Sequence, residues 1–70
     1  MTEDLRVRVN GEELLLPRGA SVTALLERLK ISTPRVAVER NREILSKSSY
    51  PTTLLEEGDS FEVVEFVGGG

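Results

Sequence analysis

The chain has 70 residues with 9 basic and 12 acidic side chains, a net charge of −3, and no cysteine or histidine. A chain this short buries only about 60% of its unfolded surface, and the missing residue types exclude disulfides, thiolate or imidazole metal ligands and histidine acid–base chemistry. The acidic balance argues against a nucleic-acid surface, no apolar run is long enough to cross a bilayer, and the polar N-terminus is unlike a signal peptide.

These exclusions define the expected class of protein. We expect a cytoplasmic protein, monomeric when free, with no bound metal or cofactor and no nucleic-acid or membrane partner. An enzyme with its own active site is the weakest interpretation, because a thin core leaves little room for a pocket and the commonest general base is missing.

The beginning of the chain predicts a β-hairpin. Apolar residues alternate with arginines over residues 5–9, which is the period of a half-buried strand. Asn10 and Gly11 both tolerate positive φ and form the strongest short signal for a type I′ turn. A second strand is expected over residues 12–16, ended by Pro17.

One helix is predicted after the hairpin. Ser21 is suited to be its N-cap. One helical face is apolar and contains Val22, Leu25, Leu26 and Leu29. We expect about ten residues, with Arg28 and Lys30 in the last turn and the Ser-Thr-Pro sequence of residues 32–34 ending the helix.

Three further strands are predicted in the second half, over residues 36–38, 44–45 and 60–67. Asn41 can adopt the left-handed conformation in the turn before residue 44, and residues 46–53 read as a surface loop with a short helical turn. The resulting order, two strands, a helix and then more strands, predicts an α+β roll. Its mixed sheet has four or five strands, with the helix packed across one face.

The C-terminal sequence indicates a functional tail. We expect a folded domain over residues 1–67 and a flexible tail over Gly68, Gly69 and Gly70. Glycine has no Cβ, so such a tail can thread a slot that is too narrow for other residues, and its chemistry is the terminal carboxylate of Gly70. The alternative is a frayed glycine terminus without function.

The last predicted strand presents large apolar residues on two faces. Phe61 and Val63 are expected to point inward, which places Val64 and Phe66 on the outer face before the tail. We interpret these two residues, together with Val67, as a partner-docking patch. The alternative is a bulge or twist that makes both core residues.

Two arginines are predicted to share this outer face. Arg6 and Arg8 lie there if the first strand is next to the last one, and we count them among the partner-binding residues. In that arrangement they could pair with Glu62.

Five segments of the sequence form a recognisable set: residues 20–26, 36–45, 47–50, 55–59 and 66–70, which include the Asn-x-Glu turn, the Lys-Ser-Ser-Tyr loop and the Gly-Asp turn before the glycine end. In these segments the sequence resembles the ThiS family, the sulfur carriers of thiamine biosynthesis. The departures are mild: Arg42 stands where a small residue is frequent, and Tyr50-Pro51 where a tryptophan and a small residue are frequent.

The resemblance implies a β-grasp, ubiquitin-like fold and a carrier that is not itself an enzyme. It implies that a ThiF-like adenylating enzyme uses ATP and magnesium to activate the Gly70 carboxylate. Sulfur from a donor protein then replaces the adenylate, and a ThiG-like thiazole synthase consumes the resulting thiocarboxylate.

Two alternatives remain open at this point. A ubiquitin-like modifier or interaction module would join Gly70 to a lysine or never activate it. A sulfur carrier of another pathway, for molybdopterin, cysteine or tRNA thiolation, would use the same tail.

Overall fold

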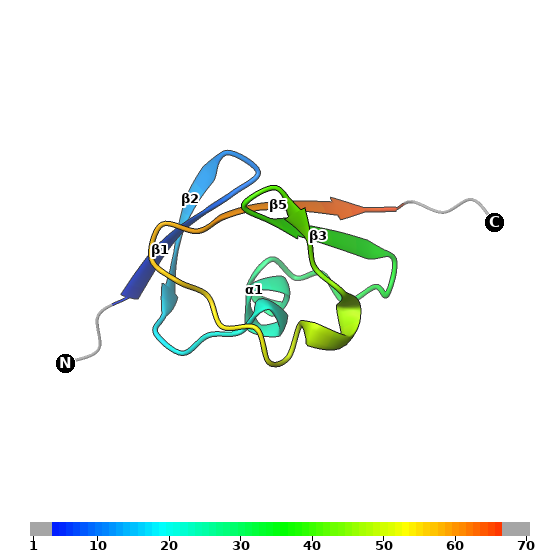
Figure 1. Ribbon diagram of the computed structural model, residues 1–70, viewed down its shortest axis with the longest axis horizontal. Helices are drawn as coiled ribbons and strands as arrows, with labels where there is room; N and C mark the ends of the chain where they lie inside the picture. Colours follow the sequence, from blue (N-terminus) through cyan, green and yellow to red (C-terminus); the bar gives the residue numbers. More distant parts are fainter. Residues whose placement is uncertain (1–3, 67–70) are drawn as a thin grey trace.

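The computed structural model describes residues 4–66, and Figure 1 shows one sheet with α1 across one of its faces. The elements are β1 (Asp4–Val9), β2 (Glu12–Pro17), α1 (Val22–Arg28), β3 (Val36–Arg40), β4 (Glu43–Ile44), the 3₁₀ helix η1 (Lys47–Ser49) and β5 (Ser60–Glu65). The strand order is β2-β1-β5-β3-β4, with β1 parallel to β5 and the other neighbours antiparallel. The predicted α+β architecture is confirmed, with five strands.

The β1–β2 hairpin turns at Asn10 and Gly11, whose φ values of +50° and +84° are those of a type I′ turn. Val9 pairs with Glu12 across this turn, and hydrogen-bonded pairs alternate with non-hydrogen-bonded ones along an antiparallel ladder. Pro17 therefore falls at a non-hydrogen-bonded position, where its missing N–H does not interrupt the pairing with β1.

The outer edge of β2 is partly covered by the helix. Leu15 also occupies a non-hydrogen-bonded position of the hairpin, so its carbonyl faces away from β1. Arg28 Nη1 donates to this carbonyl oxygen over 3.0 Å. The last residue of α1 thus binds the strand that forms one border of the sheet.

The helix begins as predicted and ends earlier than predicted. Ser21 Oγ accepts a hydrogen bond from the Ala24 N–H over 3.2 Å. Lys30 lies outside α1 with a φ of +62°, its N–H donates to Glu27 O, and the Ile31 N–H donates to Leu26 O. These bonds form a Schellman motif, in which a lysine occupies the position where glycine is usual, so the predicted ten-residue helix was wrong.

The core lies between α1 and the inner face of the sheet. Its most deeply buried side chains are Phe61, Leu25, Val7, Val22 and Val38. Tyr50 and Leu55, from the long connection between β4 and β5, are also buried, at 7% and 4% exposure. The prediction of a surface loop over residues 46–53 was therefore wrong at Tyr50, which belongs to the core.

The β3–β4 turn shifts the short fourth strand by one residue from its predicted place. Asn41 and Arg42 have φ values of +50° and +72°, and this two-residue turn pairs Arg40 with Glu43. Ile44 then faces outward and is 76% exposed, whereas Leu45 packs against the core. The prediction had placed both residues in the strand.

Candidate functional site

The strand that leads to the glycine tail is the central strand of the sheet. Two asparagines, one from each hairpin turn, bind β5 from its two sides. On the β1 side, Asn10 Oδ1 accepts from the Val63 N–H over 2.8 Å and Asn10 Nδ2 donates to Val63 O over 3.1 Å. On the β3 side, the Asn41 N–H donates to Ser60 O over 2.7 Å and Asn41 Oδ1 accepts from the Ser60 N–H over 3.0 Å.

A buried carboxylate fixes the point where β5 begins. Asp59 is 6% exposed and accepts hydrogen bonds from Arg40 Nε at 3.1 Å, Asn41 Nδ2 at 3.2 Å and the Glu56 N–H at 2.8 Å. Arg40 Nη2 lies 3.0 Å from the same carboxylate. Because its oxygens bind these structural donors, we assign Asp59 to positioning β5 and not to chemistry.

The last strand presents its side chains as predicted. Phe61 and Val63 are buried, at 1% and 7% exposure, whereas Val64 and Phe66 are 51% and 56% exposed. Val64 and Phe66 form what we call the outer-face patch. Their orientation agrees with a docking surface, and binding of a partner there stays a prediction.

Ile44 is an exposed apolar residue of the outer face that was missed in the sequence. Ile44 pairs with Glu39 across the β3–β4 ladder, and Glu39 pairs with Glu62 of β5. Directly paired residues share a face of the sheet, so Ile44 lies on the outer face about 10 Å from β5, a distance of two strand spacings. The signal in the sequence was the two-residue turn after Arg40, which sets the register of β4.

The two predicted arginines lie at the other end of β5 from the outer-face patch. Arg8 pairs with Ser60, the first residue of β5, and Phe66 is six residues further, about 20 Å along a strand. The predicted partner-binding residues are therefore divided into two groups, and Arg6 and Arg8 do not adjoin the patch.

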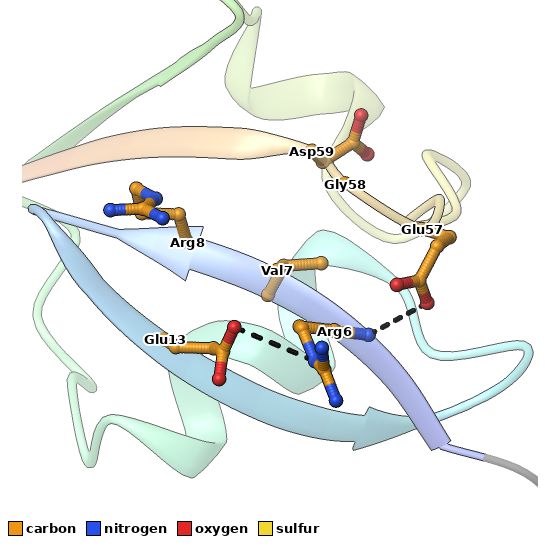
Figure 2. Close-up of a pocket in the computed structure, with 7 residues that line it drawn as sticks. All are labelled: Arg6, Val7, Arg8, Glu13, Glu57, Gly58 and Asp59. Atoms are coloured by element: carbon orange, nitrogen blue, oxygen red, sulfur yellow. Dashed lines mark hydrogen bonds and ion pairs between the residues drawn. The ribbon is translucent and has the colours of Figure 1, made fainter.

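Figure 2 shows that Arg6 points toward Glu13 on β2, and the Arg6 Nε and Glu13 Oε2 atoms are 3.5 Å apart. The Arg6 N–H donates to Glu57 Oε1 over 3.0 Å, and together with Arg8 these side chains line a hollow of about 130 Å³. Arg6 thus forms its ion pair with Glu13 and not with Glu62. The β1–β5 register explains this, since it continues from Val9 and Phe61 to place Glu62 beside Asn10.

The predicted reactive residues lie outside the described residues. They are Gly70, the threading glycines Gly68 and Gly69, and the docking residue Val67. The described chain ends at Phe66, whose N–H donates to Arg35 O over 2.8 Å. Within residues 4–66, no group of three or more acidic side chains is placed to hold a metal ion, and no helix is long and apolar enough to cross a membrane.

Comparison with known proteins gives consistent matches along nearly the whole chain. The ThiS family model matches residues 3–70. The sulfur carrier protein ThiS of Bacillus subtilis is 34% identical over 65 residues, which cover 91% of this chain and 98% of that protein. The crystal structure of the thiamine biosynthesis protein ThiS from Geobacter metallireducens superposes with a TM-score of 0.74 at 36% identity, covering 94% of this chain and 100% of that one.

Larger proteins also contain a similar region. A thiazole synthase of Paramagnetospirillum magneticum is 44% identical over 66 residues, which are 94% of this chain and 20% of that protein. A thiazole synthase of Magnetococcus marinus is 38% identical over the same shares of each chain. The chain thus spans about a fifth of the length of these relatives.

Proposed function

Since the chain belongs to the ThiS family of sulfur carriers in thiamine biosynthesis, with the β-grasp fold of that family, we propose that its Gly70 carboxylate carries the sulfur. A ThiF-like enzyme adenylates this carboxylate, sulfur from a donor protein displaces AMP, and a thiazole synthase consumes the thiocarboxylate. The observation that carries the proposal is the family match, which runs through the three C-terminal glycines.

The chemistry of the chain supports a carrier whose reactions take place on its partners. A carboxylate is a poor electrophile, so it must first be joined to a good leaving group, and AMP supplied from ATP is such a group. The chain has no cysteine to hold sulfur as a persulfide, and it has no histidine to act as a base. ATP and magnesium therefore belong to the adenylating enzyme.

The structure supports a division between a rigid body and a threaded end. The two asparagines and Asp59 bind the start of β5 and Val63, and the Phe66 N–H donates to Arg35 O four residues before Gly70. Ordering a flexible backbone costs about 1–2 kcal/mol per residue, so threading three glycines costs about 3–6 kcal/mol. This cost favours complexes that exchange, as a carrier that serves several enzymes requires.

We assign partner docking to the outer-face patch, because Val64 and Phe66 are the described apolar side chains nearest to the tail. A partner that receives the glycines meets these two side chains first. Arg6 and Arg8 provide a second, polar contact about 20 Å away for a partner that covers the whole outer face.

Mass spectrometry of the intact protein tests the proposed function. With a ThiF-like enzyme, ATP, magnesium and a sulfur donor, the chain should gain the mass difference between sulfur and oxygen at Gly70. A chain lacking Gly70 is the control and should gain nothing. An unchanged mass with active partners, or sulfur found at another residue, would show that the chain is not this carrier.

Gly69→Ala tests the threading step separately. The added methyl group should slow adenylation by steric exclusion from the narrow slot, with an unfolding midpoint equal to that of the unmodified chain. Adenylation of the Gly69→Ala chain at the normal rate would contradict the threading argument.

A further inference from the structure

The two sides of β5 are paired to different extents. On the β3 side, pairing continues to the end of the described chain, where the Phe66 N–H donates to Arg35 O. Hydrogen-bonded positions alternate along an antiparallel ladder, so Val64 also bonds toward β3. The N–H and C=O groups of Val63 and Glu65 consequently face the opposite side, toward β1.

On the β1 side, pairing stops earlier and is completed by a side chain. The parallel ladder of β1 ends at Val9 and Phe61, and the Asn10 N–H then donates to Phe61 O over 2.9 Å. The Asn10 side-chain amide accepts from the Val63 N–H and donates to Val63 O, as the backbone of a further β1 residue would do. At Gly11 the chain turns away toward β2.

The β1–β2 hairpin ends beside Val63. Glu65 is therefore the first residue of β5 whose N–H and C=O point to the β1 side without the hairpin next to them. The residue is exposed, and no backbone or side-chain partner for its N–H and C=O lies within residues 4–66. Unpaired backbone groups at a strand edge are a template for pairing with another chain, and within the described residues Glu65 offers one N–H and one C=O of this kind. These groups lie a few residues before those that carry the proposed chemistry.

We propose that an extended segment of the thiazole synthase pairs with this edge of β5 at Glu65 as an added strand. The proposal rests on the proposed function and adds the partner and its mode of binding. Main-chain hydrogen bonds of this kind provide affinity, and they also fix the direction of the strand to which they bind.

Two observations identify the occupant. Thiazole synthases contain a region similar to this domain in one polypeptide, so in those relatives the two parts work at high local concentration. The exposed acidic side chain of Glu65 lies at the open edge. The incoming segment is therefore expected to carry lysine or arginine, because opposite charges direct the register of such pairings.

A pair of substitutions at one position separates the backbone contact from the side-chain contact. Glu65→Pro removes the N–H that faces the open edge, and proline is tolerated in strands where the N–H is not used by the sheet. Glu65→Ala removes the charge and keeps the N–H, so it is the matched control. Both chains should fold with unfolding midpoints close to that of the unmodified chain.

Binding to a thiazole synthase without a fused carrier domain gives the first result. Glu65→Pro should raise Kd about tenfold or more, since it deletes a hydrogen bond and its ring meets the added strand, while Glu65→Ala should change Kd by about threefold at most. Equal Kd values for the two variants would overturn the proposal.

Amide hydrogen exchange of the unmodified chain gives a result that does not depend on the variants folding. The Glu65 N–H should exchange rapidly in the free chain and become protected on binding the synthase, whereas the Phe66 N–H should be protected in both states. Rapid exchange of the Glu65 N–H in the complex would overturn the proposal, as would protection by the adenylating enzyme in place of the synthase. A chain that gains sulfur normally but shows no protection would leave the carrier function intact.

Discussion

The hydrogen bonds between Asn10 and Val63 are expected to make a large contribution to stability. Asn10→Gly keeps a residue that adopts positive φ and removes both side-chain bonds. At about 0.5–1.5 kcal/mol for each bond, the loss should be about 1–3 kcal/mol. Asn10→Ala removes the same bonds and adds about 1–2 kcal/mol of left-handed strain, so its loss should be about 2–5 kcal/mol.

Urea unfolding with linear extrapolation measures these losses, which are large against the total of about 4–10 kcal/mol expected for a domain of this size. Arg42→Gly is the matched control, because Arg42 also has positive φ in a hairpin turn, at +72°, and has no side-chain bond to β5. It should leave stability unchanged or raise it slightly. An Asn10→Gly chain as stable as the unmodified one would refute the role given to this side chain.

Three further predictions concern separate parts of the fold. Asp59→Ala should lower the free energy of unfolding by about 2–4 kcal/mol, because the partly exposed Arg40 and two other donors lose their acceptor. A loss below about 1 kcal/mol would contradict the role of this carboxylate. Lys30→Gly should stabilise the chain by about 0.5–1 kcal/mol and raise Tm by a few degrees, because glycine relieves the strain at φ +62°; a lower Tm would be the contrary result. Phe66→Ala should cost less than about 1 kcal/mol yet weaken binding to the partner enzymes, whereas Phe61→Ala should cost about 3–5 kcal/mol, and equal losses would mean that Phe66 is a core residue.

The features predicted correctly from the sequence are those that depend on near neighbours in the chain. The alternation of Phe61 and Val63 with Val64 and Phe66 places side chains on faces because a strand has a period of two. The Asn10-Gly11 turn was predictable for a similar reason, since its backbone angles are a local property of these residue types.

Features that depend on tertiary contacts could not be predicted in this way. Asn10 and Val63 are 53 positions apart, and an asparagine in a turn gives no sign of which strand its amide will bind. Lys30 ends α1 in a conformation that usually requires glycine, and the partly buried Ile31 that follows it packs against the core. Tertiary packing there overrides the local preference of the residue.

The hydrogen bond between Arg28 and Leu15 has a consequence for concentrated solutions of the protein. The β2 edge is the longer border of the sheet, and copies of the chain could join there into open fibrils. The guanidinium group occupies one of the carbonyls that such a contact needs, and Pro17 has no N–H to offer at the next outward position. Self-association through the β2 edge is thereby discouraged. Strand pairing stays available at Glu65 of the central strand, on the side that the hairpin leaves open.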